Sequence, residues 1–123
     1  MHVLTVDDSR ASRLVIVRFL TDLGFQATEA VDGTEGLRYL RGGRKFDVIL
    51  VDWEMPGMSG VEFIRAVRSD AATIDTPIIM ISTLNSSDRL VEALEAGANE
   101  YIMKPFTKEI LAMKLDLLGV ESK

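Results

Sequence analysis

Five short apolar runs alternate with amphipathic segments along the chain, and this alternation limits its possible folds more than any other feature. The runs are Val3–Val6, Phe25–Ala30, Val48–Val51, Ile78–Ile81 and Tyr101–Met103. The segments with helical spacing are Arg10–Leu23, Thr34–Leu40, Gly60–Val67, Ser87–Ala96 and Thr107–Leu118. The run Val48–Val51 is typical of a strand buried on both faces, and strict strand–helix alternation favours a parallel sheet with right-handed crossovers. We therefore predict an α/β fold, a doubly wound five-stranded parallel sheet with five helices.

Length and composition narrow the class of protein. The alternating units use almost all of the 123 residues, so we expect one domain over residues 1–123, with no room for an output domain. Cysteine is absent, which excludes a disulfide framework. No apolar run approaches the ~20 residues of a membrane span, and the start lacks a secretion signal, so we expect a cytoplasmic protein. The net charge of −5 argues against direct binding to nucleic acid.

Polar residues follow four of the five predicted strands. They are Asp7 and Asp8 after the first, Asp52 after the third, Ser82 and Thr83 after the fourth, and Lys104 and Pro105 after the fifth. The carboxyl ends of parallel strands meet at one edge of the sheet, where open α/β folds bind their ligands. We therefore expect these side chains to form one site.

The residue types in this predicted site suit phosphoryl transfer. Three neighbouring carboxylates repel one another, and a hard divalent cation such as Mg²⁺ relieves that repulsion with oxygen ligands. Lys104 and Ser82 can then contact an anionic group delivered to Asp52. A carboxylate nucleophile beside a metal ion and an ammonium group can accept a phosphoryl group to form an acyl phosphate.

Each piece also has an ordinary structural interpretation. An Asp pair after a strand often caps a helix, a Ser at a strand end often bonds locally, and Lys-Pro often marks a turn. Only their combination, each at a strand end, favours a reactive site.

Four motifs show a resemblance to a known family. They are Val6-Asp7-Asp8-Ser9, the run from Asp52 to Gly60 (DWEMPGMSG), Ile81-Ser82-Thr83 and the run from Tyr101 to Phe106 (YIMKPF). Over essentially its full length the chain resembles the response-regulator receiver domains of two-component signalling, most of all the stand-alone, CheY-like type found in chemotaxis. The resemblance implies a flavodoxin-like sheet of order 2-1-3-4-5. It also implies a signalling switch rather than an enzyme, with at most self-phosphorylation and autodephosphorylation.

The resemblance further implies a role for each matching residue. Asp52 would accept a phosphoryl group from a histidine kinase. The ligands of Mg²⁺ (or Mn²⁺) would be Asp7, Asp8, Asp52 and the backbone carbonyl of Glu54. Phosphoryl contacts would come from Ser82, Thr83 and Lys104, and the Lys104–Pro105 bond would be cis.

The same resemblance implies a readout. Ser82 and Tyr101 would act as a switch that alters the face made by the fourth helix, fifth strand and fifth helix. That face would bind a phosphorylation-dependent target, possible examples being a flagellar motor protein or a kinase. The protein would be a monomer or weak dimer.

Three positions depart from the common pattern of the family. Ser82 stands where Thr is commoner, Glu54 follows Asp52 by two residues, and the apolar Leu84 follows Ser82 by two. A charged or apolar side chain near the site can hinder the hydrolytic water. We therefore hypothesise that the phosphorylated lifetime differs from that of fast-cycling chemotaxis members.

Other functions stay open at this point. The chain could be a phosphate sink or relay without an output partner, or a receiver excised from a longer protein. A phosphatase of the haloacid-dehalogenase type also uses an Asp nucleophile with Mg²⁺, but Asp52-Trp53-Glu54-Met55-Pro56 departs from its Asp-x-Asp-x-Thr pattern.

Overall fold

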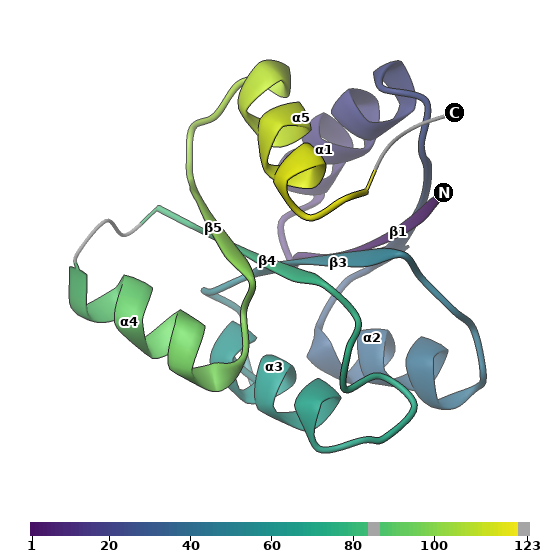
Figure 1. Cartoon of the computed structure of the whole chain (residues 1–123), viewed down its shortest axis with the longest axis vertical. Coiled ribbons are helices and arrows are strands. Elements are labelled where there is room, and N and C mark those ends of the chain that lie inside the picture. The colour runs from purple at the N-terminus through teal and green to yellow at the C-terminus, as the bar shows by residue number, and fades with distance from the viewer. Residues whose placement is uncertain (84–86, 121–123) are drawn as a thin grey trace.

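The computed structural model describes residues 1–83 and 87–120, which form five strands and five helices in strict alternation (Figure 1). The strands are β1 (His2–Val6), β2 (Gln26–Ala30), β3 (Val48–Asp52), β4 (Ile78–Ser82) and β5 (Glu100–Met103). The helices are α1 (Arg10–Asp22), α2 (Gly33–Arg41), α3 (Gly60–Arg68), α4 (Ser87–Ala96) and α5 (Lys108–Leu117). All strand pairs are parallel, in the order β2-β1-β3-β4-β5. The predicted fold class and strand order are confirmed.

The sheet is the middle of three layers. Helices α1 and α5 cover one face, and α2, α3 and α4 cover the other (Figure 1). Successive residues of β3 alternate between the two layers: Val48 and Leu50 pack with α1 and α5, whereas Ile49 and Val51 pack with α2, α3 and α4. All four are fully buried. This two-sided burial explains why β3 reads as an unbroken apolar run.

Both β3 and β4 extend one residue further than their apolar runs. Asp52 pairs with Ile81 across β3 and β4, and Ser82 pairs with Met103 across β4 and β5. The two polar residues are therefore held by the sheet itself rather than by a loop. A strand residue has a narrow range of backbone angles, so their side chains start from fixed positions at the carboxyl edge.

Hydroxyl and carboxylate side chains cap four of the helices. Ser9, Asp32, Ser59 and Thr107 each accept a backbone N–H from the first turn of α1, α2, α3 and α5, respectively. Ser59 and Glu62 form a reciprocal capping box that fixes the start of α3. The cap of α1 is Ser9, so neither Asp7 nor Asp8 is used as the capping residue.

Within the described residues, no helix is long and apolar enough to cross a membrane. Leu84, which the sequence singles out beside the predicted site, lies outside the described residues, as do residues 121–123.

Candidate functional site: an acidic cluster at the carboxyl edge

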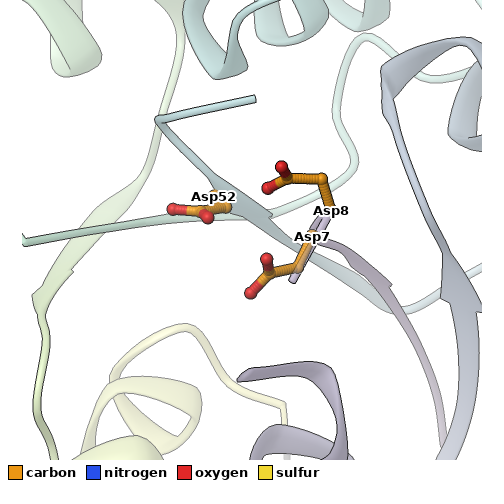
Figure 2. A group of neighbouring side chains, drawn as sticks. All are labelled: Asp7, Asp8 and Asp52. Atoms are coloured by element: carbon orange, nitrogen blue, oxygen red, sulfur yellow. The ribbon is translucent and has the colours of Figure 1, made fainter. Parts of the chain in front are cut away.

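Three carboxylates meet where β1 and β3 end side by side. Asp7 and Asp8 directly follow β1, and Asp52 is the last residue of β3 (Figure 2). One carboxylate oxygen from each of the three lies within 4.8 Å of the others. The topology thus unites residues separated by more than forty positions, as the sequence predicts.

Burial makes this cluster electrostatically costly. Asp7 is 1% exposed and Asp52 is 6% exposed, whereas Asp8 is open to solvent. The pKa of Asp52 is raised to about 7, first by burial and then by the nearby charge of Asp7, while the charge of Lys104 lowers it. The protein therefore keeps a carboxyl group whose charged form is poorly stabilised at neutral pH.

Lys104 is the cation that partly offsets this charge. Its Nζ lies 3.4 Å from Oδ2 of Asp7 and 3.4 Å from Oδ2 of Asp52. Its backbone N–H donates to the carbonyl of Ser82 at 2.8 Å, which fixes the end of β5 against β4. The peptide bond between Lys104 and Pro105 is cis.

The acidic cluster fits a hard divalent cation. Oδ1 of Asp52 is buried and has no hydrogen-bond partner within the described part of the chain. An unpaired buried carboxylate oxygen is unfavourable unless a cation or a donor reaches it. Three carboxylates that offer oxygen ligands in one place, one of them exposed to solvent, suit Mg²⁺, which takes few protein ligands and keeps several waters.

Ser82 and Tyr101 lie on the same side of neighbouring strands. Ser82 pairs with Met103, and Tyr101, two residues before Met103, pairs with Met80. Because side chains alternate along a strand, both point toward the α2–α3–α4 layer, and Tyr101 packs there half-buried. Ser82 is fully buried, and its Oγ donates to Oε1 of Glu54 at 3.0 Å.

Thr83 follows β4 directly and is exposed. It lines a pocket that Lys104 and Pro105 also line. The predicted metal, phosphorylation and phosphoryl-contact residues therefore lie at the carboxyl edge of the sheet, whereas Tyr101 lies within β5.

Arg13 also belongs to the surroundings of the site, although its position in the sequence does not indicate this. Its Nη1 donates to the backbone carbonyl of Asp7 at 2.7 Å, and its Nε pairs with Glu29 at 3.1 Å. The guanidinium thus fixes the backbone of the first metal-ligand candidate. An Arg within the first turns of a helix is usually solvent-exposed, and only the position of β2 beside β1 explains why this one is buried.

Gly60 is a second residue whose importance is visible only in the fold. Its N–H donates to the carbonyl of Trp53 at 3.1 Å. A Cβ at this position would lie 2.5 Å from the carbonyl oxygen of Asp52 and 2.9 Å from the Cα of Trp53. The start of α3 is therefore pressed against the backbone of Asp52, which only glycine permits.

This fold and acidic edge agree with a match to a known family. The sequence model described as "Response regulator receiver domain" matches residues 3–116. The chain belongs to the response regulator receiver domain family, whose members in two-component signalling act as switches.

Curated relatives include chemotaxis proteins of similar length. The chain is 43% identical over 117 residues to the chemotaxis protein CheY of Pseudomonas aeruginosa, covering 94% of each chain. It is 41% identical to the chemotaxis protein CheY-3 of Vibrio cholerae, covering 94% of this chain and 89% of the relative.

The solved structures that this chain resembles also include a chemotaxis protein and a receiver domain. The V. cholerae chemotaxis protein CheY4 has a TM-score of 0.89 at 38% identity, covering 94% of this chain and 96% of the other. The receiver domain of the sensor histidine kinase PA1611 from P. aeruginosa has a TM-score of 0.86 at 28% identity, covering 94% of each chain. That structure holds a magnesium ion in its active-site cleft.

Proposed function

We propose that this protein accepts a phosphoryl group on Asp52 from the phosphohistidine of a histidine kinase. The observation that supports this most strongly is the environment of its carboxylate. Oδ1 is buried without a hydrogen-bond partner in the described structure, and Oδ2 lies 3.4 Å from Nζ of Lys104. Lys104 thus offsets only part of the negative charge of this carboxylate, which is left able to react with an electrophilic phosphorus atom.

In the proposed transfer, a carboxylate oxygen of Asp52 bonds to phosphorus as the bond from phosphorus to the histidine nitrogen breaks. The electron pair of that bond leaves with the imidazole. Lys104 and the hydroxyls of Ser82 and Thr83 contact the phosphoryl oxygens of the product. Since Lys104 already lies beside Asp52, it need not travel far to do so.

The metal site proposed for this reaction uses Asp7, Asp8, Asp52 and the backbone carbonyl of Glu54. When bound there, Mg²⁺ (or Mn²⁺) would neutralise negative charge that develops during transfer. The acidic cluster and its unpaired buried oxygen support this assignment.

For the output, we propose that phosphorylation alters the α4–β5–α5 face through Ser82 and Tyr101. A groove on this face is lined in part by Leu90, Leu94, Tyr101 and Met103. Leu90, Leu94 and Met103 are at least 40% exposed, which is typical of a surface that binds another protein. A target in chemotaxis, such as a flagellar motor protein, agrees with the names of the relatives, and such a switch would act in the cytoplasm.

Intact-protein mass spectrometry tests the phosphoryl transfer. Acetyl phosphate with Mg²⁺ should add one phosphoryl group to the wild type and none to Asp52→Ala, and chelation of the metal should abolish the addition. An unmodified wild type, or equal labelling of the variant, contradicts the proposal. A partner screen with and without beryllofluoride then separates a switch from a phosphate sink, because only a switch should gain a non-kinase partner.

A further inference from the structure

The hydroxyl of Ser82 is engaged by a side chain outside the proposed phosphoryl chemistry. Its Oγ donates to Oε1 of Glu54 at 3.0 Å. Ser82 is fully buried at the end of β4, whereas Glu54 is an exposed residue in the loop after β3. The bond therefore links the loop that follows Asp52 to the end of the neighbouring strand β4.

A serine hydroxyl carries a single proton, so it donates to one acceptor at a time. If Ser82 is to donate to a phosphoryl oxygen on Asp52, it must give up its bond to Glu54. We propose that the Glu54 side chain is a latch that holds Ser82 in its resting position and so opposes the phosphorylated state. This inference rests on the function proposed above.

The backbone and the side chain of Glu54 have separate roles. Its backbone carbonyl is a proposed metal ligand, and any substitution of the side chain leaves that carbonyl in place. The carboxylate acts through Ser82. A side-chain variant therefore tests the latch without deleting a metal ligand.

The neighbouring residue extends the connection to α4. Trp53 is almost fully buried, and the guanidinium of Arg89, in the first turns of α4, lies 4.6 Å from the centre of its ring. Trp53 and Glu54 thus contact α4 and β4 from consecutive positions after Asp52. Loss of the bond between Ser82 and Glu54 would change the conformation of the loop that contains Trp53 and Glu54. This loop lies next to the face proposed to bind a target.

The affinity for beryllofluoride, a mimic of the phosphoryl group, tests the latch at saturating Mg²⁺. Trp53 is the only tryptophan and directly follows Asp52, so its fluorescence can report binding. Glu54→Ala should tighten beryllofluoride binding by about tenfold, the effect of losing one hydrogen bond to a charged acceptor. Glu54→Gln keeps an acceptor oxygen and should tighten binding by only about two- to threefold. Glu92→Ala, which removes an exposed acid from α4, is the control for net charge.

A double-mutant cycle separates the latch from simple charge repulsion. In a Ser82→Ala background the hydroxyl is gone, so Glu54→Ala should change the affinity by less than about twofold. An equal gain in both backgrounds, or an equal gain for Glu54→Gln and Glu54→Ala, would overturn the latch in favour of repulsion. No gain for Glu54→Ala would also overturn it. If Ser82→Ala does not fold, the comparison of the Gln and Ala variants decides alone. Failure of the wild type to bind beryllofluoride would instead contradict the proposed function.

Discussion

Nζ of Lys104 lies 3.4 Å from Oδ2 of Asp52, and it keeps the same distance to Oδ2 of Asp7. A single cation is thus shared between the proposed acceptor and a proposed metal ligand. Its side chain is about one-fifth exposed, so water weakens these attractions only in part. Lys104 and a divalent cation therefore compete for the same negative charge.

Removal of this ammonium should have opposite effects on metal binding and on phosphorylation. In Lys104→Ala the carboxylates lose their cation, so Mg²⁺ should bind about three- to tenfold more tightly. Phosphorylation by acetyl phosphate should slow by about tenfold or more, because the variant cannot neutralise the incoming group. Titration of Trp53 fluorescence measures the first effect, and a mass-spectrometric time course measures the second.

Lys108→Ala is the matched control, because Lys108 pairs with Asp22 at 3.6 Å instead of with the acidic cluster. It should behave as the wild type in both assays. Weaker Mg²⁺ binding in Lys104→Ala would contradict the competition between the two cations.

The raised pKa of Asp52 predicts a pH-dependent stability in the absence of metal. Its pKa is raised from 3.8 to about 7, so between these values the folded protein binds more protons at this site than the unfolded chain. The stability that this site contributes is present below about pH 4 and is lost as the pH rises through about 7. Asp52→Asn removes the ionisation.

Asp52→Asn should therefore unfold at a higher temperature than the wild type near pH 8 without Mg²⁺. The gain should be on the order of 2 kcal/mol and should shrink as the pH falls toward about 5. Thermal unfolding followed by circular dichroism measures it. A gain that does not change with pH would show that packing, rather than the carboxylate charge, causes the difference.

The alternation of apolar runs with segments of helical spacing was sufficient to predict the five β-α units, because each pattern corresponds directly to one type of secondary structure. The strand order depended on family resemblance, since periodicity carries no information about which strands are neighbours. Asp7, Asp52 and Lys104 could be selected because they end strands. Arg13 could not be selected from the sequence, because its role depends on the backbone carbonyl of Asp7 and on Glu29 of the neighbouring strand. The bond between Ser82 and Glu54 likewise depends on side-chain positions at the end of β4 and in the loop after β3.

Arg13 should therefore act as a positioning residue for the metal site. Arg13→Gln cannot reach both Asp7 and Glu29, so it should lower stability by about 1–3 kcal/mol and weaken Mg²⁺ binding by about three- to tenfold. Urea unfolding and Trp53 fluorescence measure the two effects. Arg18→Gln is the control, because Arg18 is largely exposed on the same helix. Loss of stability with unchanged Mg²⁺ affinity would restrict Arg13 to a structural role.

Gly60 offers a test of how closely α3 supports the acceptor. In Gly60→Ala the new Cβ would clash with backbone atoms of Asp52 and Trp53, and displacing backbone atoms is energetically costly. We expect a loss of about 2–3 kcal/mol in stability and slower phosphorylation, because Asp52 must shift. Gly43→Ala is the comparison, since a Cβ there meets nothing within 4 Å and only its left-handed backbone is strained. It should lose stability but keep the phosphorylation rate. Normal phosphorylation in Gly60→Ala would show that the contact does not position Asp52.

The assignment of Asp52 as the acceptor is tested most directly by locating the phosphoryl group among the three neighbouring carboxylates. After reaction with acetyl phosphate and Mg²⁺, borohydride reduction traps the acyl phosphate, and peptide mass spectrometry identifies the modified residue. We predict modification at Asp52 alone, with the peptide that carries Asp7 and Asp8 unchanged. Modification at Asp7 or Asp8, or at no carboxylate, would contradict the assignment of Asp52 as the acceptor.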